Sequence, residues 1–229
     1  MVKERILIVE DEKDISELLE YNLQSEGFVP VKAFDGNEAL EMVKKERPDL
    51  ILLDIMMPEM DGRDVCKALK RDEKTRHIPV VMLTAKSEES DVIVGLELGA
   101  DDYIVKPFSP KVLISRIKAV LRRTKDRKPS SELRRIGDFS IDLSKHKITY
   151  QDKSLQLTPI EFNILEFLSR YPGTVFSRDQ IMDGAWKEGK FIVDRAVDVH
   201  IRSLRKKLGK GSKVIETVHG IGYRFKDIS

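Results

Sequence analysis

Short apolar runs alternate with amphipathic segments through the first half of the chain. Five runs have the length and apolar content of buried strands, and they begin near Ile6, Val29, Leu50, Val80 and Asp102. Between them apolar residues recur at helical spacing, as in Ile15, Leu18, Leu19 and Leu23. Strands that alternate with helices are typical of βαβ units. The pattern therefore predicts an α/β fold, a five-stranded parallel sheet with helices, that ends near residue 122.

The second half has a different pattern, in which helices precede a hairpin. Thr158, Pro159 and Glu161 have the spacing of a helix start, with a threonine cap, a first-turn proline and a capping-box glutamate. A second short helix is expected after Ser177. Strand-like segments at 214–217 and 223–226 flank a Gly-containing turn. Three helices and a hairpin describe an α+β domain with a helix-turn-helix.

The third of these helices, expected over residues 194–208, has two distinct faces. An apolar stripe is formed by Val197, Ile201, Leu204 and Leu208. The opposite face is basic and consists of Arg195, Val199, Arg202, Ser203 and Lys206, with His200 and Arg205 at its flanks. A solvated amphipathic helix would have the same pattern, so this helix alone does not establish binding to a polyanion.

The two halves of the sequence differ in net charge. Residues 1–120 contain 18 Lys and Arg against 25 Asp and Glu, a net charge of −7, whereas residues 121–229 contain 23 against 14, a net charge of +9. A basic half suits a polyanion such as nucleic acid, and an acidic half does not. The polar stretch at 124–132 indicates a linker. We therefore expect domains at 1–123 and 133–229, joined by this linker.

Cysteine usage and the amino-terminal residues bear on the compartment. The single Cys66 excludes an internal disulfide framework and is typical of a reducing compartment. No apolar segment has the length of a signal peptide or a membrane span. We expect a soluble, cytoplasmic protein without a membrane partner.

Carboxylates and a hydroxyl follow three of the expected strands. Glu10 and Asp11 follow the first, Asp54 ends the third and Thr84 ends the fourth. The carboxyl ends of the strands in an open parallel sheet line one crevice, so these side chains should lie together. Taken singly, each has an ordinary alternative role, such as a helix cap for Asp11. Their occurrence together at one sheet edge indicates a site.

Crowded carboxylates repel one another, and a hard cation relieves that repulsion. Sites with only oxygen ligands and few protein groups suit Mg²⁺. A carboxylate beside Mg²⁺ is able to attack a phosphoryl group and form an aspartyl phosphate. Lys106 and Thr84 would then neutralise, or donate to, the phosphoryl oxygens. The sequence thus favours a Mg²⁺ site that handles phosphoryl groups.

The first half resembles the receiver domains of two-component response regulators, from about Ile6 to Arg123. The family's motifs occur in order as Glu10-Asp11, Asp54 with Met56-Met57-Pro58 and Asp61-Gly62, Thr84-Ala85, and Lys106-Pro107-Phe108. The resemblance implies a doubly wound, CheY-like (flavodoxin-like) fold in which Asp54 accepts a phosphoryl group from a sensor histidine kinase. It also implies that Mg²⁺ is held by Asp11, Asp54 and the backbone carbonyl of Met56, with Glu10 assisting.

The same resemblance implies a conformational switch. Thr84 and Tyr103 would be its two residues, with the hydroxyl moving toward the phosphoryl group as the aromatic ring turns inward. Lys106 would contact the phosphoryl group, and the Lys106–Pro107 bond is expected to be cis.

Phosphatases of the haloacid dehalogenase type also place an aspartyl nucleophile after an apolar strand. They need a second aspartate two residues further on, and that position is Met56 here. Because the general acid is absent, a lasting phosphoaspartate is favoured over rapid turnover. We therefore do not expect an enzyme.

The second half resembles the winged-helix effector domain of the OmpR/PhoB subfamily over about Leu133 to Ile228. The resemblance implies that helix 194–208 lies in the major groove of double-stranded DNA and the hairpin wing in the adjacent minor groove. The residues it implies as DNA contacts are Arg195, His200, Arg202, Ser203, Arg205, Lys206, Trp186 and His219. Trp186 suits a structural role equally well, and whether the arginines contact bases or phosphates stays open.

Two positions depart from the phosphate-regulon regulators that this domain resembles. His219 replaces a wing-tip arginine, and Ser203 replaces the second of two consecutive arginines. A neutral histidine would bind the minor groove less tightly. For this reason no target sequence is transferred.

Active dimers of the subfamily pair through the fourth helix, the fifth strand and the fifth helix. The apolar patch would consist of Ile93, Leu96 and Ile114. Ion pairs between protomers would be Glu97 with Lys118, Asp101 with Arg123, and Asp102 with Arg116. A further family ion pair is replaced by Val92 and Val112.

Together these expectations describe a response regulator of transcription. Phosphorylation would promote receiver dimerisation, binding to direct-repeat half-sites and contact with RNA polymerase. Two alternatives are a constitutive DNA-binding protein that is never phosphorylated and a receiver that sequesters another protein. The complete acidic site weighs against the first alternative, and the basic helix and wing weigh against the second.

Overall fold

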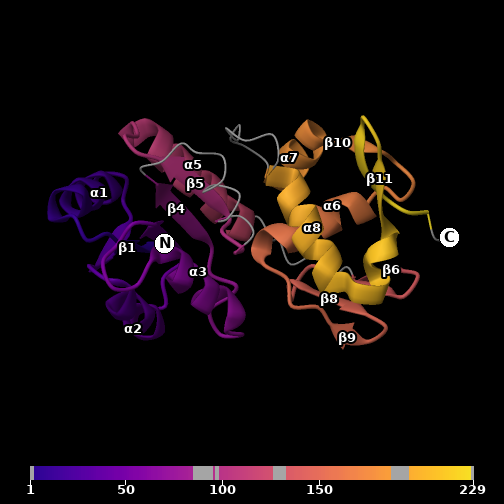
Figure 1. The fold of residues 1–229 in the computed structure, drawn as a ribbon, viewed down its shortest axis with the longest axis horizontal. Coiled ribbons are helices and arrows are strands. Elements are labelled where there is room, and N and C mark those ends of the chain that lie inside the picture. Colours follow the sequence, from indigo (N-terminus) through magenta and orange to yellow (C-terminus); the bar gives the residue numbers. More distant parts are fainter. Residues whose placement is uncertain (1–2, 85–94, 96–97, 126–132, 187–195, 228–229) are drawn as a thin grey trace. The chain divides into compact units, whose positions relative to one another are not determined.

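The computed structural model describes residues 3–84, 95, 98–125, 133–186 and 196–227 (Figure 1). The contacts within the chain divide it into two compact units, Met1–Leu121 and Arg122–Ser229. No described helix has the length and apolar character needed to cross a membrane.

Five parallel strands form the sheet of the N-terminal unit, as the sequence predicts. Their order is β2-β1-β3-β4-β5, and their bounds are β1 (Arg5–Val9), β2 (Val29–Ala33), β3 (Leu50–Asp54), β4 (Val80–Thr84) and β5 (Asp102–Val105). Figure 1 shows α1 (Lys13–Ser25) and α5 (Pro110–Lys125) on one face of the sheet and α2 (Gly36–Glu46) and α3 (Gly62–Arg71) on the other. The doubly wound α/β architecture is confirmed.

Burial explains why these segments are strands and where the site lies. Every residue of β3 and β4 is buried, which suits apolar strands covered by helices on both faces. A core cluster joins the sheet to α1 and α5 and includes Ile8, Leu19, Leu52, Leu83 and Ile117. The strand order reverses between β1 and β3, so the carboxyl ends of these two strands open onto a crevice.

The helices α2 and α3 begin in the same way. Asp35 caps α2 by accepting a hydrogen bond from the backbone nitrogen of Glu38, and Asp61 caps α3 by accepting one from Arg63. Gly36 and Gly62 are the first residues of these helices. The cap at Asp61 fixes the start of α3 a few residues after β3 ends.

Among the described residues, the C-terminal unit consists of two antiparallel sheets, the three α-helices that the sequence predicts and one 3₁₀ helix. The first sheet has the order β6-β7-β8-β9, with β6 (Leu133–Ile136), β7 (Phe139–Asp142), β8 (Lys147–Tyr150) and β9 (Lys153–Ser154). The second has the order β10-β12-β11, with β10 (Phe176–Ser177), β11 (Ile215–Val218) and β12 (Gly222–Phe225). The helices are α6 (Pro159–Ser169), α7 (Arg178–Trp186), α8 (Ala196–Leu208) and the 3₁₀ helix η1 (Gly209–Val214).

The predicted start of α6 is confirmed in atomic detail. The Thr158 side chain accepts a hydrogen bond from the backbone nitrogen of Glu161, and the Glu161 carboxylate accepts one from the backbone nitrogen of Thr158. Pro159 occupies the first position. This capping box satisfies two backbone donors that the helix itself leaves free.

The boundaries of one helix and of both hairpin strands differ from the sequence pattern, and the second of these strands, expected at 223–226, is β12 at Gly222–Phe225. Helix α5 extends to Lys125, so residues 124 and 125, expected in the linker, are helical. Arginine and lysine favour helices, and polarity alone does not end one. Val214 belongs to η1, and the first hairpin strand begins at Ile215. The expected bounds of the domains and linker stay predictions.

Candidate functional site

Three carboxylates converge where β1 and β3 end. Asp54 is the last residue of β3, and Glu10 and Asp11 directly follow β1, its neighbour in the sheet. One oxygen from each carboxylate lies within 4.8 Å of the others. Glu10 and Asp54 are buried, and Asp11 is partly exposed. The structure brings together the acidic residues that the sequence places at this sheet edge.

Lys106 approaches the carboxylates from the end of β5. Its Nζ donates to Oε2 of Glu10 at 2.7 Å and to Oδ2 of Asp54 at 3.1 Å. Its backbone nitrogen donates to the carbonyl oxygen of Thr84, at the end of β4. The Lys106–Pro107 bond is cis, as expected. The ammonium group therefore lies against two carboxylates and offsets part of their repulsion.

Burial and charge compete within this cluster. Burial raises the pKa of Glu10 from 4.5 to about 7, and the hydrogen bond from Lys106 offsets only part of the rise. Burial also opposes the charge on Lys106, but the hydrogen bond to Glu10 and the charge of Asp54 outweigh it and raise the pKa of Lys106. Lys106 thus keeps its positive charge at neutral pH.

The donor set fits a hard divalent cation. The three carboxylates supply only oxygen, as Mg²⁺ prefers. Among the described residues, Oε1 of Glu10 is buried without a hydrogen-bond partner. A buried polar atom left unsatisfied in this way is costly, and a bound ion with its water shell would remove the cost. The cluster is therefore able to hold a metal ion.

Thr84 and Tyr103 lie on adjacent strands near this cluster. Thr84 ends β4, and Tyr103 in β5 pairs with Met82, two residues before Thr84. Both side chains are buried, and both make interactions within the chain. Met56 follows β3 with an exposed side chain. The switch role of the first two residues and the Mg²⁺ contact of the Met56 carbonyl stay predictions.

Gly62 packs directly against the backbone of Asp54. A Cβ atom at Gly62 would lie 1.9 Å from the carbonyl oxygen of Asp54 and 3.0 Å from Cα of Ile55. The backbone nitrogen of Gly62 donates to the carbonyl oxygen of Ile55 at 3.0 Å. The start of α3 thus helps to fix the position of Asp54, and only glycine allows this approach.

The expected dimer face is partly described. The described residues do not include Val92, Ile93, Leu96 and Glu97, and the side chain of Arg123 also lies outside the description. Ile114 is buried, whereas Val112 is exposed. Lys118 forms an ion pair with Glu26 at 2.6 Å, within the same chain. The apolar patch and the contact between protomers stay predictions.

Two acids of this face already have partners in their own chain. Arg116 donates to both oxygens of Asp102, at 2.9 and 3.1 Å. Nζ of Lys70 lies 2.7 Å from Oδ2 of Asp101, and both side chains are 4 % exposed. The Asp102–Arg116 pair, expected between protomers, thus occurs within one chain, and a dimer would have to compete with both internal pairs.

Helix α8 has the apolar stripe that the sequence predicts. The stripe residues Val197, Ile201, Leu204 and Leu208 are all buried. On the expected basic face Arg202 and Lys206 are exposed, but Val199 is buried and His200 is only 1 % exposed. The burial of His200 differs from its expected place on the flank of an open face. Its contact with DNA stays a prediction.

Three further polar residues of α8 have partners within the C-terminal unit. Oγ of Ser203 donates to Oε1 of Glu161 at 2.7 Å, and Nζ of Lys207 lies 2.6 Å from Oε2 of the same carboxylate. Ser203 therefore bonds to α6. Arg205 donates to the carbonyl oxygen of Ile215. The sequence indicated both Ser203 and Arg205 as DNA contacts but gave no sign of these internal bonds.

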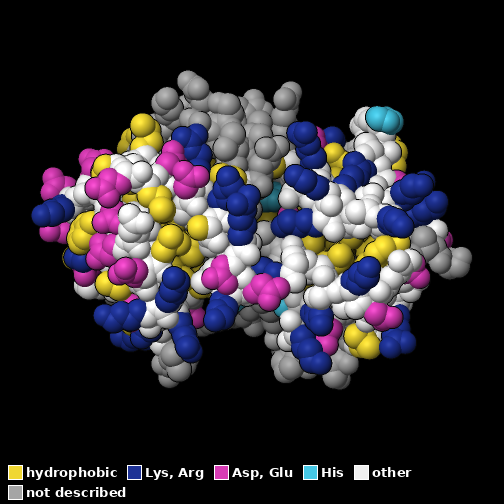
Figure 2. All heavy atoms as spheres, turned by 60° about the horizontal axis from the view of Figure 1, so that its bottom comes forward, with side chains coloured by type: hydrophobic (Ala, Val, Ile, Leu, Met, Phe, Trp, Pro, Cys, Tyr) yellow, Lys and Arg dark blue, Asp and Glu magenta, His cyan; other side chains and the backbone are white. Residues whose placement is uncertain are grey.

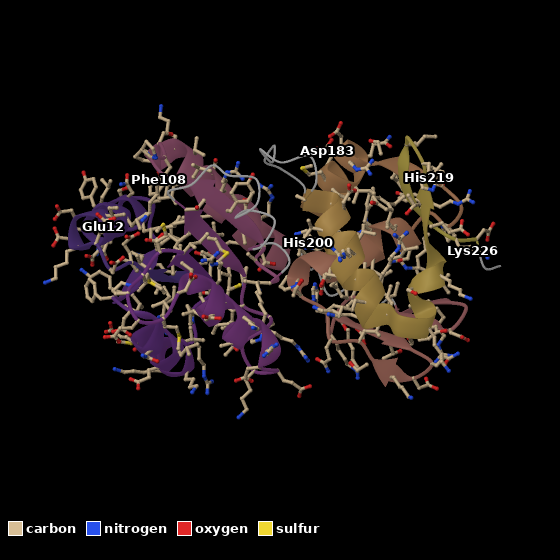
Figure 3. The ribbon with its side chains drawn as sticks, viewed as in Figure 1. Glu12, Phe108, Asp183, His200, His219 and Lys226 are labelled. Atoms are coloured by element: carbon tan, nitrogen blue, oxygen red, sulfur yellow. The ribbon has the colours of Figure 1, made fainter. Side chains whose placement is uncertain are left out.

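The remaining expected contacts are less fully described. Arg195 lies outside the described residues, and Trp186 ends α7 with a side chain that is not described. His219 is exposed on the hairpin, as Figure 3 shows.

Arg178, which is not among the predicted DNA contacts, donates to Asp198 at 2.7 Å. Its only sequence signal is its place at the start of the second helix.

Surface charge differs between the units. Figure 2 shows acidic side chains gathered on the N-terminal unit, whereas Lys and Arg predominate among the charged side chains on the visible face of the C-terminal unit. This distribution agrees with the opposite net charges of the two halves of the sequence.

Each of the two units matches a known protein family. Residues 6–118 match the response regulator receiver domain, and residues 152–225 match the family described as transcriptional regulatory protein, C terminal. The DNA-binding response regulator MtrA of Mycolicibacterium smegmatis is 44 % identical over 226 residues, covering 97 % of each chain. The phosphate regulon transcriptional regulatory protein PhoB of Escherichia coli is 46 % identical over 223 residues, covering 96 % of this chain and 97 % of its own.

A solved structure agrees with these matches. A mutant of RitR superposes with a TM-score of 0.81 at 29 % identity, covering 98 % of this chain and 99 % of its own. Both units, in the same order, are thus shared with full-length relatives. The chain belongs to the OmpR/PhoB family of two-component response regulators, in which a receiver domain precedes a DNA-binding transcriptional regulatory domain.

Proposed function

We propose that the chain is a transcription regulator switched by phosphorylation of Asp54, with a sensor histidine kinase as phosphodonor. The observation that carries this proposal is the cluster of Asp54, Glu10, Asp11 and Lys106, in which three carboxylates and one ammonium group meet at the end of β3. Relatives that are response regulators by name support the same assignment. The regulator acts in the cytoplasm, where its DNA is found.

The residues of the cluster have distinct tasks in this chemistry. An oxygen of Asp54 attacks the phosphorus of a phosphohistidine, so that a P–O bond forms as the P–N bond breaks and the imidazole leaves. Lys106 neutralises a phosphoryl oxygen, and the hydroxyl of Thr84 donates to another. Asp11, Asp54 and the Met56 carbonyl would hold Mg²⁺ with assistance from Glu10, and the bound ion would stabilise the charge on the phosphoryl oxygens.

Removal of one ligand should weaken Mg²⁺ binding. In Asp11→Asn a neutral amide replaces a carboxylate, so we expect Mg²⁺ affinity in isothermal titration calorimetry to fall at least about tenfold. Glu12→Gln is the matched control, because Glu12 is the next residue and its side chain is exposed. Equal Mg²⁺ affinity in Asp11→Asn and the wild type would remove Asp11 from the metal site.

The phosphorylated receiver is proposed to dimerise and so to pair two DNA-binding units. Thr84 and Tyr103 relay the change, and the surface of β5 and α5, together with Ile93, Leu96 and Glu97, forms the contact. Paired units bind direct-repeat half-sites about one helical turn apart and contact RNA polymerase. Purified protein should therefore enrich such sites from genomic fragments when a small phosphodonor and Mg²⁺ are added. Enrichment that does not change with the donor would show that Asp54 does not gate binding.

In the DNA complex α8 lies in the major groove, and the hairpin β11–β12 reaches the adjacent minor groove. Arg202→Ala should weaken binding to an enriched fragment at least about tenfold at fixed salt, because Arg202 is exposed on α8. Arg135→Ala is the control, since Arg135 is exposed on β6 and its loss changes net charge equally. If the two variants lose affinity alike in a gel-shift titration, α8 does not form the interface.

A further inference from the structure

Arg205 is bound to the hairpin wing. Its Nη2 donates to the carbonyl oxygen of Ile215 and to Oγ1 of Thr217, each at 2.8 Å. Both acceptors belong to β11, and Arg205 belongs to α8. Nη2 carries two hydrogens, so these two bonds use its full donor capacity.

Tyr223 of β12 extends this connection to a second helix. Its ring centroid lies 5.6 Å from the guanidinium carbon of Arg205 and 5.5 Å from that of Arg178 in α7. Its hydroxyl donates to Oδ1 of Asp198 at 2.7 Å, and Nε of Arg178 donates to the same oxygen at 2.7 Å. Burial raises the pKa of Tyr223, so the hydroxyl keeps the proton that it donates.

The wing needs side-chain connections of this kind because its backbone support is small. Strand β12 pairs with β11 over four residues and with β10 over only two, Tyr223 and Gly222. A short hairpin is marginally stable by itself. The tip of the wing is the turn between β11 and β12, and it carries exposed residues, His219 among them (Figure 3). The direction of the wing relative to α8 therefore depends on contacts made near the base of the wing.

We propose that Arg205 is a positioning residue, which holds the wing against α8 through Ile215, Thr217 and Tyr223, and that this role, rather than a phosphate contact, is its contribution to DNA binding. The inference rests on the proposed function, because it concerns how α8 and the wing engage neighbouring grooves together. A displacement of about 1 Å between groups that must bind together is enough to weaken a site. Lysine cannot replace Arg205 in this role, because its side chain is one bond shorter and its ammonium group lacks the planar face with which a guanidinium group stacks on the ring of Tyr223.

The decisive variant is Arg205→Lys, which keeps the charge but shortens the side chain by one bond and removes the planar guanidinium group. We expect about tenfold weaker binding to the fragment most enriched by the wild type, with an unchanged slope of log affinity against log salt. Lys206→Ala is the neighbouring control and should reduce that slope by about one, as loss of one phosphate contact does. In DNA-free protein Arg205→Lys should also speed hydrogen exchange of the β11 amides at least about tenfold, because loss of the two bonds frees the strand.

Thr217→Val tests the same connection from the wing, since it removes the accepting hydroxyl and keeps the side-chain shape. The loss of affinity caused by Thr217→Val should largely disappear in the Arg205→Lys background, because both changes remove the same hydrogen bond between Arg205 and Thr217. Wild-type affinity in Arg205→Lys would overturn the inference and leave the proposed function intact, provided that Lys206→Ala binds more weakly. If the wild type enriches no fragment, the proposed function fails, and an unchanged β11 exchange rate in Arg205→Lys would then overturn the inference separately.

Discussion

Asp54→Ala should abolish covalent phosphorylation of the full-length protein. In the proposed mechanism Asp54 supplies the attacking oxygen, and alanine has no nucleophile, so incubation with acetyl phosphate and Mg²⁺ should give no phosphorylated species in intact-mass spectrometry. The wild type should gain one phosphoryl group under the same conditions. Size-exclusion chromatography should then show a donor-dependent dimer for the wild type alone.

The variant should remain folded, because the substitution removes one of three crowded carboxylates. Lys106 keeps its 2.7 Å contact with Glu10 after the change, so the ammonium group retains a buried partner. Asp64→Asn is a matched control, since Asp64 is an exposed acid in α3 and should not affect phosphoryl uptake. Donor-dependent phosphorylation that persists in Asp54→Ala, or is lost in Asp64→Asn, would show that another residue is the acceptor.

The fold and the acidic cluster are predictable because both follow from local pattern. The apolar run that ends on Asp54 is a strand, and a parallel sheet brings the ends of its strands to one edge. Glu10 and Asp11 follow from the same rule, since β1 lies beside β3. Likewise the capping box at Thr158 is a signal contained within four residues, and the structure reproduces it. In each case the decisive interactions lie close together in the chain or follow from the sheet topology.

The parts that could not be predicted depend on contacts between side chains far apart in the sequence. Ser203 and Glu161 are 42 residues apart, and helical spacing gives no sign that the hydroxyl bonds to α6. The ion pair of Lys70 with Asp101 spans 31 residues and joins α3 to the residue before β5. Charge patterns on α8 therefore indicated candidate DNA contacts, but not which of these residues bond within the domain.

Gly62→Ala should destabilise the receiver and slow its phosphorylation together. The new methyl group would lie 1.9 Å from the Asp54 carbonyl oxygen, far inside contact distance, and the atom that it meets is backbone. Overpacking usually costs about 1–3 kcal/mol, and we expect at least about 3 kcal/mol here because β3 is held in the sheet on both sides. Displacement of Asp54 should slow phosphoryl uptake from acetyl phosphate by about tenfold or more.

Gly36→Ala provides a closely matched control, because Gly36 is likewise the first residue of a helix with an aspartate cap. A Cβ atom at Gly36 would meet Cγ2 of Val65 and Cβ and Cγ of Met60 at 2.7–2.9 Å, which is a smaller overlap than the 1.9 Å approach to the backbone at Gly62. Calorimetric unfolding of both variants should therefore show the larger loss for Gly62→Ala, and only that variant should phosphorylate slowly. The contrary outcome is an equal loss of stability in the two variants with normal phosphorylation of each. It would mean that the contact between Gly62 and the Asp54 backbone does not position the Asp54 carboxylate, and that α3 and β3 move apart without consequence for it.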